Sequence, residues 1–168
     1  EEGLRARTLV GENGFFKNRD GLTQFYGIVG SHFPLDLVVL ILGTNDCNAK
    51  STVKDEAIRG ALITYGDILN EWADFFEAPL PQLLIVAPPL IDESNYDGGA
   101  QKIFGPGANS RVIKLPELFR SATERQGVDF LDLQKICYPA PGDGVHLDTV
   151  GNKLVAVALE EKIRKILE

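Results

Sequence analysis

The sequence predicts a three-layer α/β/α domain built around a parallel sheet. Two short apolar runs, residues 37–42 and 82–87, are rich in aliphatic residues and are bounded by proline or glycine, as is typical of strands buried on both faces. Stretches with helical periodicity lie between and after these runs. Strands that alternate with helices favour a parallel sheet covered on both faces. At 168 residues the chain has the length of one domain, so we expect a single domain over residues 1–168.

The first half of the chain supplies two helical patterns around the first strand. A weak pattern over residues 21–33 precedes the strand at residues 37–42. The longest helix is predicted over residues 53–76, where apolar residues recur at intervals of three and four and mark one buried face. Three aromatic residues near its end are assigned to the core: Trp72, Phe75 and Phe76.

The second predicted strand, residues 82–87, is stopped by Pro88-Pro89. Residues 96–109 hold four glycines and one proline. We predict that they form a loop long enough to be a lid or an oligomer contact. A helix is predicted over residues 111–125, where Pro116 should start or kink it.

The last third of the chain predicts one more strand and one more helix. Residues 128–133 alternate more strictly between apolar and polar side chains, which favours a strand nearer an edge of the sheet. A helix is predicted over residues 154–167, with Asp148 or Thr149 as its N-cap. In sheets of this class, sites form outside the carboxyl ends of the strands. Three polar segments are expected to converge there.

Charge and cysteine content exclude several classes of partner. The net charge of −7 disfavours nucleic acid and anionic membranes, because the average surface repels both, and no run of Lys and Arg indicates a basic patch. No apolar stretch reaches the roughly 18 residues of a membrane helix, and no signal peptide is visible. Cys47 and Cys137 are predicted to be reduced and partly buried. We therefore expect a cytoplasmic protein.

The first polar segment is Asp143-Gly144-Val145-His146. An Asp three residues before a His, on a loop that contains Gly, can fold back so that its carboxylate reaches the imidazole Nδ1–H. This arrangement fixes the tautomer and stabilises the imidazolium, as in the Asp–His half of a catalytic triad. The alternative is an Asp–His pair that merely caps the following helix.

The second polar segment is Gly43-Thr44-Asn45-Asp46, directly after the first strand. There the Asn45 amide can donate a hydrogen bond to an oxyanion above the sheet edge. The alternative is an ordinary Asx turn. We expect Asp46 to brace the turn, and Cys47 to be a packing residue rather than a nucleophile.

The third segment contains Ala6, whose small side chain lets the backbone approach a ligand closely. Its N–H can then serve as a second oxyanion donor. The alternative is a surface loop in which Arg7 forms a salt bridge.

Together these segments resemble the SGNH (GDSL-type) hydrolases, in the branch of bacterial arylesterases, carbohydrate acetylesterases and acyltransferases. Asp143 to His146 resembles the family's last motif, Asp-x-x-His, and residues 43–46 resemble its Gly-x-Asn-Asp motif. Glu1 to Thr8 resembles the second motif, in which the position of Ala6 is often Gly. Asp20-Gly21 and residues 34–38 also resemble this branch.

The resemblance implies a flavodoxin-like fold and a serine esterase or acyltransferase that acts on short acyl esters such as acetyl esters. It implies that Asp143 and His146 are the triad acid and base, that Asn45 and Ala6 form the oxyanion hole, and that no metal or other cofactor is required. A small-molecule ester would be the substrate, and a homo-oligomer is expected.

The family's nucleophile motif, Gly-Asp-Ser-Leu, has no counterpart in the chain, which contains five serines: Ser31, Ser51, Ser94, Ser110 and Ser121. Ser31 is predicted at the sheet edge opposite Asn45. We therefore expect that the chain is the C-terminal part of the family fold, that it lacks the first strand and helix, and that it is inactive alone. The serine would come from an N-terminal fragment of the same protein. The alternative is a non-catalytic binding domain of the same fold. A nucleotide-binding domain is disfavoured, because the glycines of residues 11–14 do not follow a strand.

Overall fold

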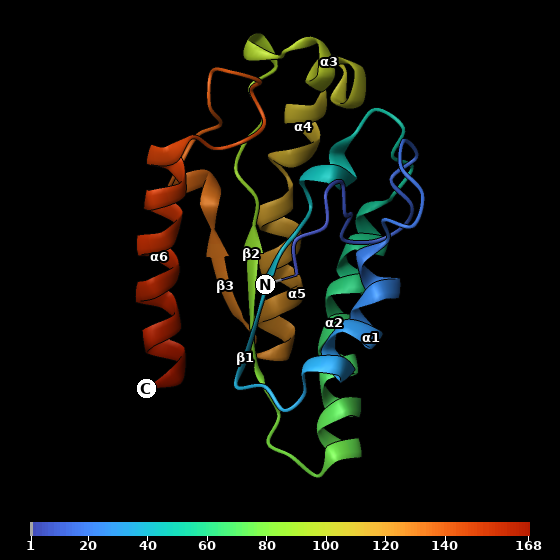
Figure 1. Ribbon diagram of the computed structural model, residues 1–168, viewed down its shortest axis with the longest axis vertical. Coiled ribbons are helices and arrows are strands. Elements are labelled where there is room, and N and C mark those ends of the chain that lie inside the picture. The colour runs from blue at the N-terminus through green and yellow to red at the C-terminus, as the bar shows by residue number, and fades with distance from the viewer. Residues whose placement is uncertain (1) are drawn as a thin grey trace.

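The computed structural model describes residues 2–168, with the exception of the Arg125 side chain, so Glu1 lies outside the described residues. The elements follow one another in this order: α1 (Gly21–His32), β1 (Leu37–Ile41), η1 (Thr44–Cys47), α2 (Asp55–Phe76), β2 (Gln82–Ala87), η2 (Glu93–Asn95), α3 (Gly98–Phe104), α4 (Ala108–Val112), α5 (Leu115–Gln126), β3 (Asp129–Asp132), η3 (Leu133–Lys135) and α6 (Thr149–Leu167). The three strands are parallel and lie in the order β1-β2-β3 (Figure 1). The predicted α/β class and parallel sheet are confirmed.

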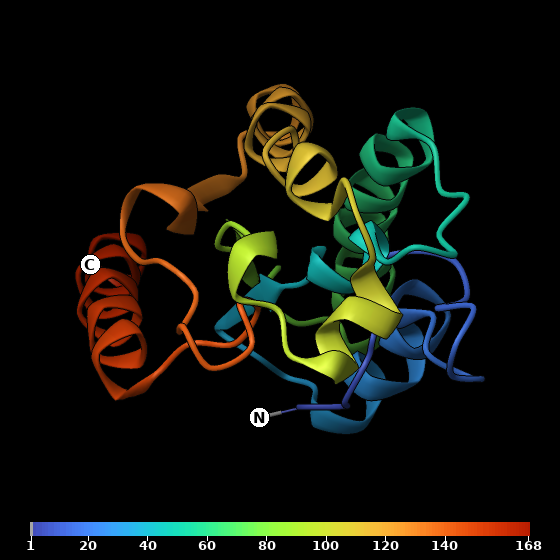
Figure 2. The same cartoon turned by 90° about the horizontal axis from the view of Figure 1, so that it is seen from above.

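Helices cover both faces of this sheet, and the alternation of side chains along β2 shows how. Leu83 and Ile85 pack into the core beneath α1, α2 and α5, whereas Leu84 and Val86 pack with apolar residues of α6 on the opposite face. Figure 2 shows α6, in red, across the sheet from the other long helices. Because β2 has a paired strand on each side and a helical layer on each face, it is the central strand of the described sheet.

Strand β1 differs from the prediction of a strand buried on both faces. Among its residues Leu40 is buried, but 42% of Ile41 is exposed. The physical reason is that β1 pairs with β2 on one side and is the edge strand of the sheet within residues 2–168. A groove of about 520 Å³ runs along it, lined mainly by apolar residues of β1 and α1.

The helix and strand limits agree with the sequence patterns at several points. The weak pattern over residues 21–33 forms α1, whose N-cap is Asp20, and β3 is an edge strand as predicted. Of the two candidate caps for the last helix, Asp148 is the N-cap, and its carboxylate accepts a hydrogen bond from the Gly151 N–H at 2.8 Å.

Three local predictions differ from the structure in whole or in part. Residues 96–109 are not a simple loop, because Asp97 caps the seven-residue helix α3. The helix predicted over residues 111–125 is divided into α4 and α5. Pro116 lies in the first turn of α5, where its missing N–H removes no hydrogen bond, and so starts that helix as predicted. Of the three aromatic residues assigned to the core, Trp72 is half-buried and packs against it, but Phe75 and Phe76 at the end of α2 are 73% and 45% exposed. Their rings contact the Trp72 ring instead.

Cys47 and Cys137 are both free thiols and both buried, in agreement with the predicted reduced state. Across the described part of the chain, no helix combines the length and the apolar character needed to cross a membrane.

One buried hydrogen bond ties the helical layer to the N-terminal segment. Tyr65 of α2 is fully buried, and its hydroxyl donates to the Leu9 carbonyl oxygen at 2.8 Å. We predict that Tyr65→Phe lowers the free energy of unfolding by about 1–3 kcal/mol, because it leaves a buried carbonyl without its donor. Urea unfolding of the purified chain measures this loss. Tyr138→Phe, at a position that is 73% exposed, is the control. An equal unfolding midpoint for Tyr65→Phe and the wild type would contradict the prediction.

Candidate active site

Residues 43–46 and the loop that holds Asp143 and His146 lie toward the carboxyl ends of the strands, in the upper half of the molecule in Figure 1. The N-terminal segment begins at mid-height and rises toward them. Residues 43–46 leave β1 and form η1, and the loop that holds Asp143 and His146 enters α6. The N-terminal segment reaches η1 through side-chain hydrogen bonds.

Asp143 and His146 form a directly bonded pair. Asp143 Oδ2 lies 2.5 Å from His146 Nδ1, and Asp143 Oδ1 accepts the backbone N–H groups of Val145 and His146, each at 2.8 Å. Partial burial opposes ionisation of Asp143, but the hydrogen bonds from the His146 side chain and these two amides outweigh it and lower the carboxyl pKa. The carboxylate therefore accepts the Nδ1–H of the imidazole.

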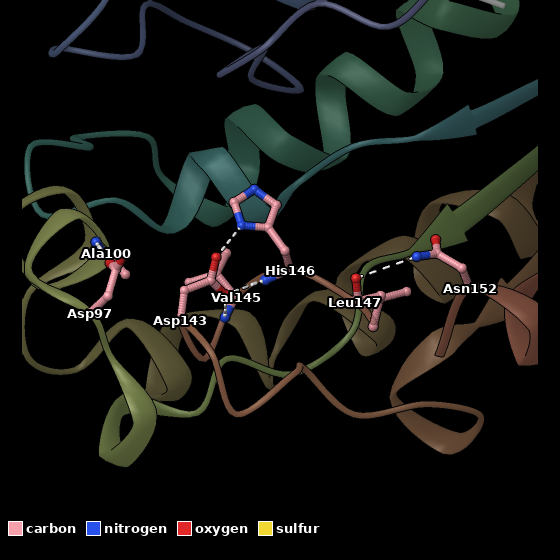
Figure 3. Close-up of polar contacts among 7 residues, drawn as sticks. All are labelled: Asp97, Ala100, Asp143, Val145, His146, Leu147 and Asn152. Carbon is pink, nitrogen blue, oxygen red and sulfur yellow. Dashed lines mark hydrogen bonds and ion pairs between the residues drawn. The ribbon is translucent and has the colours of Figure 1, made fainter. Parts of the chain in front are cut away.

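This contact leaves the other ring nitrogen of His146 facing away from Asp143 (Figure 3). The His146 side chain is 82% exposed. An imidazole that donates through Nδ1 carries a lone pair on Nε2, which makes Nε2 a base. The helix-cap alternative does not apply, because Asp148 rather than Asp143 caps α6.

The loop that presents this pair depends on Gly144. Its φ is 71°, and a Cβ at this position would lie 2.1 Å from the Asp92 carbonyl oxygen. The Asp92 N–H donates to the Gly144 carbonyl oxygen at 2.8 Å, and the Ala140 N–H donates to that of His146 at 2.7 Å. The segment that follows β2 is therefore hydrogen-bonded to the Asp–His loop, residues 143–146, and holds it in place.

Asn45 lies on η1, which begins directly after Gly43, a glycine with φ 120°. Its Nδ2 donates to the Arg7 carbonyl oxygen at 3.1 Å, which brings η1 against the N-terminal segment. This bond uses one of the two amide hydrogens. Asn45 is half-buried, and its second N–H has no hydrogen-bond partner among residues 2–168.

Ala6 occupies the third position of a β-turn that the Arg7 N–H closes on the Leu4 carbonyl oxygen at 3.2 Å. Its φ is 64°. Positive φ at the third position is the property of type II turns that favours glycine there. An alanine in this conformation is strained by about 1–2 kcal/mol. Arg7 donates to the Glu2 carbonyl oxygen, and no salt bridge of Arg7 is present among residues 2–168.

Asp46 is buried and joins two of these segments. Its Oδ2 accepts the Leu9 N–H at 2.7 Å, and its Oδ1 accepts the Val10 N–H at 3.1 Å. Burial raises the pKa of Asp46 from 3.8 to about 7, although the two amides oppose this shift. Asp46 was expected to brace its own turn, and the structure adds that it fastens the turn to the N-terminal segment.

Arg111 of α4 is a supporting residue that the sequence did not reveal. Its Nε and Nη2 donate to the Cys47 carbonyl oxygen at 3.0 and 2.8 Å, and Nη2 also donates to that of Phe104 at 3.1 Å. These bonds hold η1 against α3. One arginine on a short helix carries no distinctive pattern, so no sequence signal marked it.

The nucleophile candidates do not fit the site. Ser31 lies at the end of α1, just before β1 begins, and therefore near the amino-end edge of the sheet, as predicted. Its hydroxyl donates to the Ile28 carbonyl oxygen, and His32 Nδ1 contacts the same oxygen at 2.9 Å, which leaves that nitrogen no lone pair to act as a base. Cys47 is buried, and burial, assisted by the charge of Asp46, raises its pKa to about 12.

Comparisons with known proteins place this geometry in a family. The family model described as GDSL-like lipase/acylhydrolase matches residues 4–159. The structure is similar to Est24, a carbohydrate acetylesterase from Sinorhizobium meliloti, with a TM-score of 0.87 and 27% identity over 99% of this chain and 77% of that chain. It is also similar to the native aryl esterase of M. smegmatis, with a TM-score of 0.89 and 28% identity over 99% and 78% of the two chains. No curated protein matches the chain in sequence.

The raised pKa of Asp46 predicts a pH dependence of stability. Between about pH 4 and pH 7 the folded chain keeps a proton on Asp46 that the unfolded chain has released, so the free energy of unfolding falls as the pH rises through this window. Asp46→Asn cannot titrate and should lack this fall, whereas the exposed control Asp36→Asn should retain it. Urea unfolding at steps across the window measures the three slopes. Equal slopes for the wild type and Asp46→Asn would contradict the assignment.

Proposed function

The chain belongs to the GDSL-like lipase/acylhydrolase family, and from that premise we propose that it forms the acid–base and oxyanion-binding part of a serine esterase for short acyl esters. The observation that carries the proposal is the contact between Asp143 and His146, 2.5 Å long, at the same sheet edge as Asn45. A binding cleft alone needs neither an oriented imidazole nor a carboxylate behind it.

In the proposed reaction His146 Nε2 takes the proton of a serine hydroxyl while the serine oxygen attacks the ester carbonyl carbon. Asp143 stabilises the imidazolium that forms. The tetrahedral intermediate collapses when His146 returns the proton to the departing alcohol, which leaves an acyl-enzyme. Water, or an alcohol in the transferase mode, then attacks the acyl group by the same proton transfers in reverse.

The oxyanion of the tetrahedral intermediate is assigned to two donors of this chain, the free N–H of Asn45 and the backbone N–H of Ala6. Both are held in place before substrate arrives, Asn45 by the Arg7 carbonyl and Ala6 by its β-turn. Donors that are oriented in advance stabilise developing charge without reorganisation during the reaction.

The serine is proposed to come from a segment outside these 168 residues. Among the described residues no serine hydroxyl is hydrogen-bonded to His146. The free edge of β1 and its apolar groove offer a place for one more parallel strand, whose carboxyl end would lie near Asn45. The similar esterases also extend beyond the matched part.

The proposed substrates are short acyl esters, acetyl esters in particular, by analogy with the carbohydrate acetylesterase and the aryl esterase. We assign residues 91–109, which support the Asp–His loop, to the wall of the substrate entrance and to an oligomer contact. A cytoplasmic location accords with two free cysteines.

Asn45 should be essential for turnover and dispensable for folding. We predict that Asn45→Ala in the full-length gene product lowers kcat on p-nitrophenyl acetate by about 10²- to 10³-fold, because one oxyanion donor is lost. Circular dichroism and urea unfolding check the fold. Asn70→Ala, an exposed amide on α2, is the matched control and should turn over normally. Unchanged kcat in Asn45→Ala would remove Asn45 from the oxyanion hole.

The 168-residue chain by itself should be inert. We predict that it gives no mass shift with a fluorophosphonate serine probe and no hydrolysis of p-nitrophenyl acetate, whereas the full-length gene product gains one adduct. An adduct on the isolated chain would show that one of its own serines is the nucleophile. An inert full-length product would favour the non-catalytic binding domain instead.

A further inference from the structure

We propose that Arg19 and Asn13 are positioning residues that fix the direction of the Ala6 N–H. The inference rests on the proposed function, in which this N–H is an oxyanion donor. Neither side chain belongs to a motif that the sequence analysis identified. Both lie in the loop between the N-terminal segment and α1. Arg19 donates a hydrogen bond to the backbone carbonyl of Arg5, and Asn13 donates one to that of Ala6.

Arg19 acts on the peptide unit that contains the Ala6 N–H. In a trans peptide the C=O of one residue and the N–H of the next point in opposite directions. The Arg5 carbonyl oxygen accepts a hydrogen bond from Arg19 Nε at 2.9 Å. This bond holds the carbonyl toward Arg19, and the Ala6 N–H must therefore point away from it.

The Arg19 guanidinium is itself fixed by its own loop. Its Nη1 donates to the carbonyl oxygens of Lys17 and Asn18 at 2.9 and 3.0 Å. Its backbone carbonyl accepts the Thr8 N–H at 2.8 Å and the Thr8 hydroxyl at 2.9 Å. Within residues 2–168 the hydrogen bonds of this guanidinium go to carbonyl oxygens and it forms no salt bridge. The Arg19 side chain therefore orients backbone carbonyl groups rather than pairing with a carboxylate.

Asn13 holds the next peptide unit. It is fully buried, and its Nδ2 donates to the Ala6 carbonyl oxygen at 3.1 Å. Its Oδ1 accepts the Phe15 N–H at 3.2 Å, and its backbone carbonyl accepts Asn48 Nδ2 at 2.9 Å. The peptide units on both sides of Ala6 are thus held by side chains that are anchored elsewhere.

Two such bonds are needed because Ala6 is strained. A φ of 64° is unfavourable for alanine by about 1–2 kcal/mol, and strained backbone persists only where its surroundings hold it. Without the bond from Arg19, rotation of the peptide unit between Arg5 and Ala6 would relieve this strain. The same rotation would turn the N–H away from its present direction and remove it from the oxyanion hole.

The test uses the full-length gene product with Arg19→Met, which keeps an unbranched apolar stem and removes all donors. We expect kcat on p-nitrophenyl acetate to fall by about 10²-fold with little change in KM, because the donor acts on the transition state. Arg19→Lys keeps one donor group and should give an intermediate kcat. Lys165→Met, at an exposed position of α6 outside this network, is the control and should match the wild type.

Asn45→Ala, measured in parallel, separates this inference from the proposed function. If Asn45→Ala is impaired and folded Arg19→Met keeps wild-type kcat, Arg19 is not a positioning residue although the proposed function stands. If Asn45→Ala is also normal, the proposed function fails. A fall in kcat that is matched by a change in KM would assign Arg19 a general structural role and overturn the inference. Should Arg19→Met not fold, Arg19→Gln, with a single amide donor, is judged by the same criteria.

Discussion

The two hydrogen bonds from the Leu9 and Val10 amides to the Asp46 carboxylate join the parts on which the site depends. They connect the N-terminal segment, which carries Ala6, to the turn after β1, which carries Asn45. Because the Asp46 carboxyl group is buried, its bonds to the amides are not weakened by competing water, and they hold together the two segments that carry the proposed oxyanion donors. Burial also raises the pKa of Asp46 to about 7, so the contact between the two segments is sensitive to pH near neutrality.

The open edge of β1 imposes the second constraint. A strand with an apolar groove beside it and unpaired backbone groups along one side is suited to accept another strand. A parallel strand in that groove would end at the level of Asn45, where a nucleophile is needed. The proposed additional strand would therefore cover the exposed side of β1 and also carry the serine that the proposed reaction requires.

Local patterns predicted the sheet and most helices, because the apolar runs at residues 37–42 and 82–87 and the long periodic helix are distinctive by themselves. The spacing of Asp143 and His146 was enough to predict their contact. Bonds from side chains to distant carbonyls could not be predicted: Arg111 reaches Cys47 across 64 positions and Arg19 reaches Arg5 across 14. Such bonds depend on where the backbone passes in space, and any polar residue of sufficient length can make them.

The central claim is that Asn45, Ala6 and the Asp143–His146 pair surround one reacting carbonyl. A crystal structure of the full-length gene product inactivated by a small fluorophosphonate tests it most directly, because the phosphoryl oxygen occupies the place of the oxyanion. The account predicts a serine–phosphorus bond from a residue outside this chain, with the phosphoryl oxygen within hydrogen-bonding distance of Asn45 Nδ2 and the Ala6 nitrogen, and the serine oxygen beside His146 Nε2. A phosphoryl oxygen bound by other donors, or an adduct remote from His146, would contradict it.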